Sequence, residues 1–259
     1  MARAVWDPAQ YLRFSGERLR PALDLLAQVP LAQPSRVVDL GCGTGNVTAI
    51  LRRRFPDAEI AGVDSSADML KRARTDVPDC RFERADVAGW TPKTPPDLIY
   101  SNAALHWVPD HTTLFPRLLS VLAPGGCLAV QMPAMHDAPF RALQYEVASI
   151  GKWAKCLGGI GSAPAILDAA AYWDLLRPLT ASLDLWDTTY THALTGDDPV
   201  VQWAMGTSLR PFLDPLSPEK RTAFLAAYAE AIRPHYPKHA DGTTLLPFRR
   251  RFIVALAGT

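Results

Sequence analysis

One short segment of the chain, Val37–Gly45, combines residue types that can hold a nucleotide. An apolar run leads into three glycines, and a helical pattern opens directly afterwards at Asn46. Because glycine has no Cβ atom, the backbone can turn tightly there and come close to a ligand, and the N–H groups at the start of the next helix can donate to it. Asp64 ends the following apolar stretch, about 20 residues on, where nucleotide-binding βαβ units carry a ribose-binding carboxylate.

The spacing of the glycines distinguishes two classes of nucleotide. A dinucleotide fingerprint, G-x-G-x-x-G, requires glycine where this chain has Asn46. The glycines here stand at 41, 43 and 45 and follow an acid, Asp39. A negative charge beside the turn disfavours a pyrophosphate and favours a cationic aminoacyl ligand. The pattern therefore indicates S-adenosylmethionine, which carries an ammonium and a sulfonium. The structural alternative is a glycine turn that only packs a strand against a helix.

Composition limits the classes of function. With 259 residues, 48% of them hydrophobic, the chain suits one large domain or one domain with an elaborated cap. The formal net charge is +1 and the basic runs are short, so we expect no nucleic-acid partner. The lack of a signal region or a long apolar stretch predicts a soluble, cytoplasmic protein without a membrane partner. The four cysteines lack the paired spacing of a zinc site or disulfide framework, so we expect no metal; the oligomeric state stays open.

Strand and helix patterns alternate through the first half of the chain. The strands that we expect are Arg36–Leu40, Glu59–Val63, Cys80–Arg84, Asp97–Ser101 and Cys127–Gln131, and the helices are Asn46–Arg54, Ser65–Arg74 and His111–Leu122. Continuous apolar strands separated by helices predict an α/β fold with a mostly parallel sheet covered on both faces. In such sheets ligands bind beyond the carboxyl ends of the strands. Acids and amides at those ends, from Asp39 to Asn102, therefore predict one site.

The second half has a different organisation. We expect helices at Phe140–Lys155, Ala165–Leu176, Asp198–Gly206 and Pro218–Arg233, and strands at Leu183–Thr191 and Arg250–Leu256. The last strand would complete a seven-stranded sheet as an antiparallel edge. Residues 195–247 are too many for a simple crossover. We therefore expect one domain, 1–259, in which 195–247 and 1–30 form a helical cap over the substrate site.

The first half resembles a class I S-adenosylmethionine-dependent methyltransferase, a family with a Rossmann-like fold. Asp39–Gly45 resembles its first motif, and Asp64 resembles its ribose-binding acid. Ala85–Val87 resembles the adenine-binding step, and Ser101–Trp107 the segment under the methionine moiety. Pro124–Gly126 resembles the turn before the fifth strand. The resemblance predicts that residues 36–131 form the cofactor-binding core.

The resemblance implies S-adenosyl-L-methionine as the cofactor and a set of residues that bind it. Asp64 would accept hydrogen bonds from the ribose hydroxyls, and Asp86 would accept one from the adenine amine. The implied cofactor-binding residues are Tyr11, Asp39, Gly41, Gly43, Asp64, Ser65, Met69, Asp86, Val87 and Asn102. Each has a structural alternative: a helix-capping acid or asparagine, a turn aspartate, a core methionine, or a tyrosine that only packs.

A narrower resemblance extends over nearly the whole chain, to the branch of this family that methylates trans-aconitate. The segments that carry it include Trp6–Pro8, Ala129–Pro133, Asp184–Trp186, Leu209–Pro211 and Phe248–Phe252. Two features depart from that branch: the loop Lys152–Ile166, and His106, which stands where glutamine is expected. Both bear on the substrate pocket.

This resemblance implies transfer of a methyl group to one carboxylate of a small tricarboxylate. A carboxylate is already ionised at neutral pH, so we expect no general base and no catalytic acid–base pair. The protein would instead align the reacting atoms and exclude water. Such an anion needs cationic donors, and the planar fork of arginine suits a carboxylate. The substrate-binding candidates are Arg20, His106, Arg210, Tyr236 and Arg250.

Other functions stay open at this point. One alternative is methylation of another small acid, or of an acid on a carrier protein; the balanced charge disfavours a basic docking patch. Another is a protein that binds S-adenosylmethionine without catalysis. For Arg210, which lies in an apolar stretch, a structural ion pair is the competing role. A dehydrogenase is disfavoured by Asn46 and Asp39.

Overall fold

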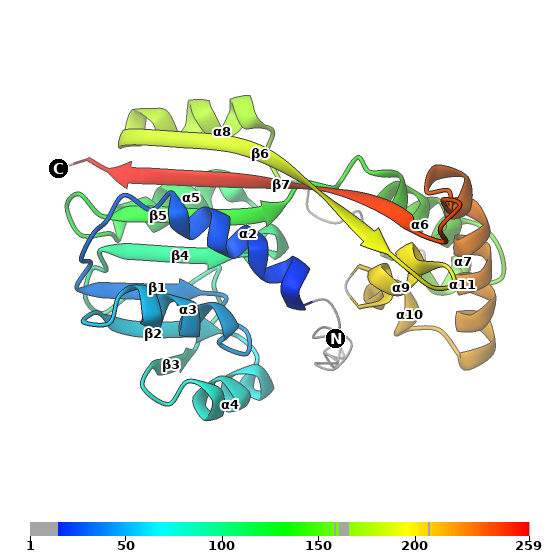
Figure 1. Ribbon diagram of the computed structural model, residues 1–259, viewed down its shortest axis with the longest axis horizontal. Coiled ribbons are helices and arrows are strands. Elements are labelled where there is room, and N and C mark those ends of the chain that lie inside the picture. Colours follow the sequence, from blue (N-terminus) through cyan, green and yellow to red (C-terminus); the bar gives the residue numbers. More distant parts are fainter. Residues whose placement is uncertain (1–14, 158, 161–165, 207, 259) are drawn as a thin grey trace. The chain divides into compact units, whose positions relative to one another are not determined.

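A seven-stranded sheet forms the frame of the fold (Figure 1). The structure is a computed structural model that describes residues 15–157, 159–160, 166–206 and 208–258. The strands are β1 (Arg36–Leu40), β2 (Glu59–Asp64), β3 (Arg81–Arg84), β4 (Leu98–Asn102), β5 (Cys127–Pro133), β6 (Thr180–Leu194) and β7 (Thr244–Ala257). Their order in the sheet is β3-β2-β1-β4-β5-β7-β6. This order confirms the predicted α/β fold with a seven-stranded sheet.

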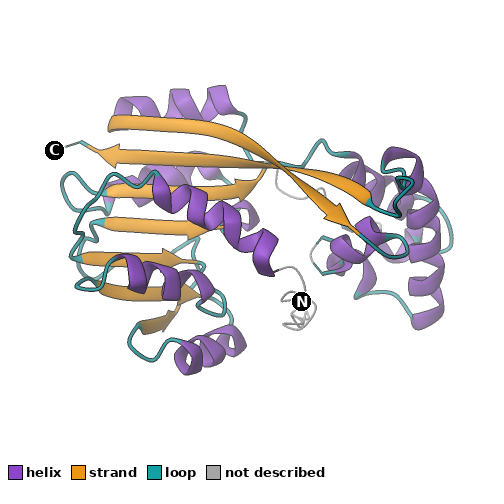
Figure 2. Ribbon diagram, in the orientation of Figure 1, coloured by secondary structure: helices purple, strands orange, loops and turns teal. Residues whose placement is uncertain are grey.

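The first five strands run parallel. β1 pairs with both β2 and β4, and the sheet continues from β2 to β3 and from β4 to β5. β4 and β5 are buried along almost their entire length, because helices cover both faces, as parallel sheets require. Figure 2, in the orientation of Figure 1, shows α2 (Ser15–Ala27) and α3 (Asn46–Arg54) in front of the strands and α5 (His111–Ser120) behind them.

The last strand differs from the expected edge strand. β7 is antiparallel to β5, with Pro133 opposite Arg250, but it lies between β5 and β6, so β6 is the edge. Both strands are longer than the predicted Leu183–Thr191 and Arg250–Leu256, because they pair with each other beyond the end of β5. Burial alternates over the first residues of β7 and becomes continuous where β5 joins it.

The helices follow the predicted order with local differences. They are α2 (Ser15–Ala27), α3 (Asn46–Arg54), α4 (Ala67–Asp76), α5 (His111–Ser120), α6 (Pro139–Ser149), α7 (Ala154–Leu157), α8 (Ala169–Leu176), α9 (Pro199–Met205), α10 (Arg210–Leu213) and α11 (Pro218–Ile232), with 3-10 turns η1 (Leu105–Trp107), η2 (Arg177–Leu179) and η3 (Arg233–His235). The predicted helix 140–155 is divided, because Gly151 has a left-handed φ of 78°. α8 begins later than predicted, because Asp168 accepts from the Ala171 N–H at 2.8 Å and caps it.

The chain divides into two compact units. The sheet unit comprises 18–134, 166–188 and 250–259, and the helical unit comprises 1–17, 135–165 and 189–249. The helical unit therefore includes 135–165 as well as the predicted cap segment 195–247. By contrast, α2 belongs to the sheet unit from residue 18 onwards. It is held there by a hydrogen bond that the Tyr100 hydroxyl donates to the Ala22 carbonyl. The role of a cap over the substrate site stays a prediction. In the described part of the chain, no helix has the length and apolar character needed to span a membrane.

Each unit has its own core. In the sheet unit, Leu128 and Phe115 are fully buried in a cluster between the strands and α5. The core of the helical unit is aromatic: the ring centroid of Phe224 lies 5.4 Å from that of Trp153 and 6.1 Å from that of Phe212. These clusters supply most of the apolar burial on which folding depends.

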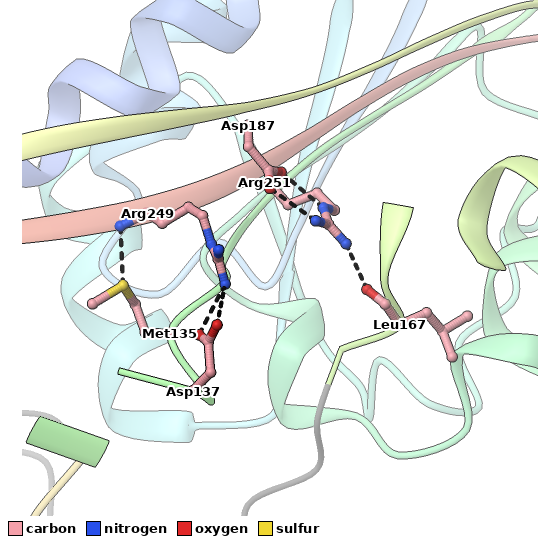
Figure 3. A network of polar contacts seen from close by, with 6 residues as sticks. All are labelled: Met135, Asp137, Leu167, Asp187, Arg249 and Arg251. Atoms are coloured by element: carbon pink, nitrogen blue, oxygen red, sulfur yellow. Dashed lines mark hydrogen bonds and ion pairs between the residues drawn. The ribbon is translucent and has the colours of Figure 1, made fainter. Parts of the chain in front are cut away.

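Two arginines of β7 make ion pairs with aspartates (Figure 3), and the two pairs differ in burial. In the sheet unit, Arg251 donates to both Asp187 oxygens at 2.8 Å and to the Leu167 carbonyl at 2.7 Å. The Arg251 side chain is 9% exposed. In the helical unit, Arg249 donates to the two Asp137 oxygens at 2.8 and 3.0 Å, but these side chains are 38% and 58% exposed. In the first pair the guanidinium is buried and Asp187 is 31% exposed, whereas both side chains of the second pair are exposed.

We predict that Asp187→Ala destabilises the protein far more than Asp137→Ala. Removing Asp187 leaves a buried guanidinium without its counter-ion, which costs about 3 kcal/mol. Removing Asp137 breaks an exposed pair and costs less than about 1 kcal/mol. Urea unfolding followed by circular dichroism measures both, and equal losses would contradict the difference in burial.

Candidate functional site

The glycine loop after β1 lies against the segment that follows β4. Gly41 has φ 82°, and a Cβ atom there would lie 2.2 Å from the Cβ of Ala104. Its N–H donates to the Val63 carbonyl at the end of β2, at 2.7 Å. Only glycine fits this approach, so the loop is held at the carboxyl ends of three adjacent strands. Gly43 has φ 55° and nothing within 4 Å of its Cβ position, which leaves open space on one side of the loop.

Asp39 is an acid buried inside this turn. It is 1% exposed, and its Oδ2 accepts a hydrogen bond from the Thr48 hydroxyl at 2.6 Å. Burial raises the pKa of the Asp39 carboxyl to about 7; the Thr48 hydrogen bond lowers that pKa, and the charge of Asp64 raises it. Near neutral pH this carboxyl therefore lies close to its titration midpoint, and a cation bound beside it would favour the ionised form.

Thr48 was not among the predicted site residues. It stands in the first turn of α3, is fully buried, and fixes the Asp39 carboxyl. The signal in the sequence was a polar residue on the inward face of the helix that follows the glycine loop. Its role as a hydrogen-bond donor depends on the turn that brings α3 back over β1.

Asp64, at the end of β2, connects two loops. Its Oδ2 accepts from the Gly43 N–H at 3.0 Å and its Oδ1 accepts from the Ser66 N–H at 2.8 Å. The Ser66 hydroxyl, and not Ser65, caps α4 by accepting from the Met69 N–H at 3.4 Å. Ser65 is exposed, whereas Met69 is half-buried in the first turn of α4. Asp64 is therefore not the capping residue itself, and its half-buried carboxylate lies next to the glycine loop.

The loop after β3 carries the predicted adenine contacts. Asp86 is exposed, and its Oδ1 accepts from the Ala88 N–H at 3.0 Å, as expected of a turn aspartate. Arg117 of α5, which was not predicted, donates to the Val87 and Ala88 carbonyls at 3.1 and 2.8 Å and also contacts the Trp90 carbonyl. These contacts fix the backbone of the loop.

The ends of β4 and β5 carry buried polar atoms. Asn102 pairs in register with Gln131. In the described part of the chain, Asn102 Oδ1 is buried without a hydrogen-bond partner. A buried acceptor without a donor costs about 1–3 kcal/mol, so this atom fits the binding of a ligand that donates. Ala103 follows with an unusual φ of 53°, and its N–H donates to the Gln131 carbonyl at 2.9 Å.

The predicted substrate-binding residues belong to both compact units, and three of them lie in the sheet unit. Arg250 is 4% exposed, lies at the carboxyl end of β5, and donates from Nη1 to the Gln131 amide oxygen at 3.3 Å. His106 is half-buried in η1, with its ring 4.7 Å from that of Trp107. Arg20 lies on α2 with its side chain 74% exposed and 3.9 Å from Asp24.

Two further predicted residues belong to the helical unit. Arg210 opens α10 and is half-buried, and no ion pair of its side chain is found among the described residues. Tyr236 accepts from the Phe140 N–H at 3.4 Å. Tyr11 lies outside the described residues. The sheet unit thus brings together the glycine loop, Asp39, Asp64, Asn102 and Arg250.

Comparisons with known proteins show the family of the chain. A family model described as a methyltransferase domain matches residues 37–126. The chain is 51% identical to a trans-aconitate 2-methyltransferase of Methylobacterium radiotolerans, over 97% of this chain and 98% of that one. It is 48% identical to a trans-aconitate 2-methyltransferase of Paracidovorax citrulli, over 96% and 97%.

Solved structures share the fold at low identity. A phosphoethanolamine N-methyltransferase of Haemonchus contortus in complex with S-adenosyl-L-methionine is 14% identical, with a TM-score of 0.58 over 97% of this chain and 56% of that one. An S-adenosylmethionine-dependent methyltransferase of Mesorhizobium loti is 22% identical, with a TM-score of 0.52 over 93% and 99%. These likenesses support the class I methyltransferase fold.

We predict that Asp39 makes the ligand-free protein less stable as the pH rises. The folded state holds the Asp39 proton up to about pH 7, whereas the unfolded chain loses it near pH 4. The folded state therefore binds more protons between these values, and the free energy of unfolding falls as the pH rises through them. Asp39→Asn, which keeps an acceptor for Thr48, should be more stable relative to wild type at pH 8 than at pH 5.

Urea unfolding at both pH values measures this effect. Asp86→Asn, at an exposed carboxylate, is the matched control and should leave the pH dependence unchanged. A wild-type and an Asp39→Asn protein that respond identically to pH would show that Asp39 is ionised in the folded state throughout.

Proposed function

Since this chain belongs to the family of trans-aconitate 2-methyltransferases, we propose that it transfers the methyl group of S-adenosyl-L-methionine to a carboxylate oxygen of trans-aconitate. The products are the monomethyl ester and S-adenosylhomocysteine. The observation that carries the proposal is a buried acidic group and a buried basic group at one edge of the sheet. The Asp39 carboxyl at the end of β1 suits a cationic donor, and the buried Arg250 beside the end of β5 suits an anionic acceptor.

The residues of the sheet unit fit the cofactor. Asp39 and the acceptor Asn102 Oδ1 would bind the ammonium of its aminoacyl end, and Asp64 would accept from the ribose hydroxyls. Asp86 and the Val87 backbone would contact the adenine. The glycine loop, Ser65 and Met69 complete this set in the sheet unit. Tyr11, which lies outside the described residues, is kept as a further proposed contact. When bound, the cofactor supplies an electrophilic methyl group on a sulfonium.

The proposed reaction needs no proton transfer by a side chain of the protein. The carboxylate of the acid is the nucleophile and is ionised at neutral pH, so no side chain needs to act as a base. The negative charge of the acid and the positive charge of the donor partly cancel in the reaction, which a site poor in water favours. The protein aligns the two reactants, and such alignment can lower a barrier by about 7–11 kcal/mol.

Among the candidate residues, we propose Arg250 as the main contact of the acid substrate. Its guanidinium is buried, held by the Gln131 amide, and cannot lose its proton at neutral pH. We keep Arg20, His106, Arg210 and Tyr236 as further proposed donors to the carboxylates of the acid. A cytoplasmic location stays a prediction.

The reaction is tested directly. The purified protein is incubated with methyl-labelled S-adenosyl-L-methionine and trans-aconitate, citrate, isocitrate or an acid bound to a carrier protein. Base-labile label on trans-aconitate, with S-adenosylhomocysteine formed in equal amount, supports the proposal. Label on another acid alone would show that this acid, and not trans-aconitate, is the substrate. Cofactor binding without any transfer would favour the non-catalytic alternative.

We predict that Asp64→Ala weakens the binding of S-adenosylhomocysteine by about 1.5–3 kcal/mol, the range for hydrogen bonds to a charged group. Calorimetry measures the dissociation constant. Ser66→Ala is the matched control, because it removes the cap of α4 but not the carboxylate. If Ser66→Ala weakens binding as much as Asp64→Ala, the role of Asp64 is to order the loop and not to bind ribose.

A further inference from the structure

The side-chain amide of Gln131, near the carboxyl end of β5, has an orientation that its contact with Arg250 determines. The residue is fully buried, and its Oε1 accepts from Arg250 Nη1 at 3.3 Å. A guanidinium group only donates, so the amide oxygen must face Arg250 and the NH2 group must face away. In the part of the chain that the structure describes, Gln131 Nε2 is buried without a hydrogen-bond partner.

A second glutamine shows how such an amide is satisfied when its role is structural. Gln144 in α6 is also fully buried, and its Oε1 also accepts from an arginine, Arg141, at 3.0 Å. Its Nε2, however, donates to the Ser208 hydroxyl at 2.7 Å and contacts the Tyr228 hydroxyl at 3.4 Å. Since buried polar groups are nearly always hydrogen-bonded, the two N–H hydrogens of Gln131 point to an acceptor that belongs to a ligand.

The position of Gln131 indicates which ligand this is. Gln131 lies between Asn102 on β4 and Phe252 on β7, and Arg250 shares a face with Phe252 because it is two residues away. A cation and a free amide donor thus lie side by side, which suits a carboxylate. β5 is two strands from β1 in the sheet order, or about 10 Å from the glycine loop at ordinary strand spacing. The acid substrate fits this place better than the cofactor does.

We propose that the Gln131 amide nitrogen donates to a carboxylate of the acid substrate that is not methylated, beside the Arg250 guanidinium. This inference rests on the proposed function and deepens it. The pair selects acids that have a second carboxylate, because a monocarboxylate whose own group faces the methyl donor would leave the Gln131 amide nitrogen without an acceptor. Gln131 is then a determinant of specificity that the sequence did not reveal.

Gln131→Glu is the sharpest test. The substitution keeps the shape of the side chain and an acceptor for Arg250, but it replaces the donating NH2 group by a carboxylate oxygen. A purely structural role would be preserved. We expect the KM for trans-aconitate to rise by more than about 10-fold, and the dissociation constant of S-adenosylhomocysteine to change less than twofold.

Gln131→Met removes the donor without adding a charge. We expect the KM for trans-aconitate to rise by about 10- to 150-fold, the range for one hydrogen bond to a charged group. Gln144→Met is the matched control. It should lower the melting temperature while leaving the KM for trans-aconitate and the KM for S-adenosyl-L-methionine within twofold of the wild-type values. The increase of melting temperature on addition of trans-aconitate gives a readout of acid binding that needs no turnover.

The outcomes are distinguishable. If wild type methylates trans-aconitate and both Gln131 variants keep its KM, the inference is wrong and the proposed function stands. If the variants lose affinity for S-adenosylhomocysteine but not for the acid, the donor serves the cofactor and the inference is wrong. If wild type neither binds nor methylates the acid, the proposed function fails and this inference fails with it.

Discussion

The burial of one carboxyl group, that of Asp39, constrains the architecture around it. It lies at the end of the central strand β1 and is 1% exposed, with Thr48 as a hydrogen-bond donor. A buried carboxylate is unfavourable unless it is hydrogen-bonded, protonated or paired with a cation. The chain meets this constraint in two ways. The glycine loop turns tightly enough to bring Thr48 of α3 back onto the carboxyl, and the raised pKa lets the group hold a proton when no cation is present.

Polar atoms further along the same edge of the sheet extend this arrangement. Asn102 Oδ1 and Gln131 Nε2, one acceptor and one donor, are buried and have no hydrogen-bond partner in the described part of the chain. β7 adds three arginines, Arg249 to Arg251, whose side chains have different partners. Alternation along the strand directs Arg249 and Arg251 to carboxylates, as Figure 3 shows, and directs Arg250 to Gln131. Structural ion pairs and the proposed binding of an organic anion are therefore carried by neighbouring residues of a single strand.

The comparisons separate what belongs to the fold from what belongs to the family. Methyltransferases that are 14% and 22% identical share the architecture. The trans-aconitate 2-methyltransferases are 51% and 48% identical in sequence to this chain over almost their full length, which includes the part that matches the helical unit. A shared fold by itself says little about substrate. The proposed acid specificity would therefore reside in residues outside the glycine loop, and Gln131 with Arg250 is the group for which the contacts give a physical argument.

The sequence by itself determined the parallel core and the glycine loop, because apolar runs, turn residues and glycine requirements are local properties. It placed β1, β2, β4 and β5 almost residue for residue, and it singled out Asp39, Asp64 and Arg250 as candidates, whose roles stay predictions. The tertiary structure decided the rest. The place of β7 between β5 and β6 depends on pairing between residues distant in the chain, and the division at Gly151 depends on a single left-handed residue. The raised pKa of Asp39, the loop contacts of Arg117 and the buried amide donor of Gln131 all result from burial and partners far away in sequence, which no local pattern encodes.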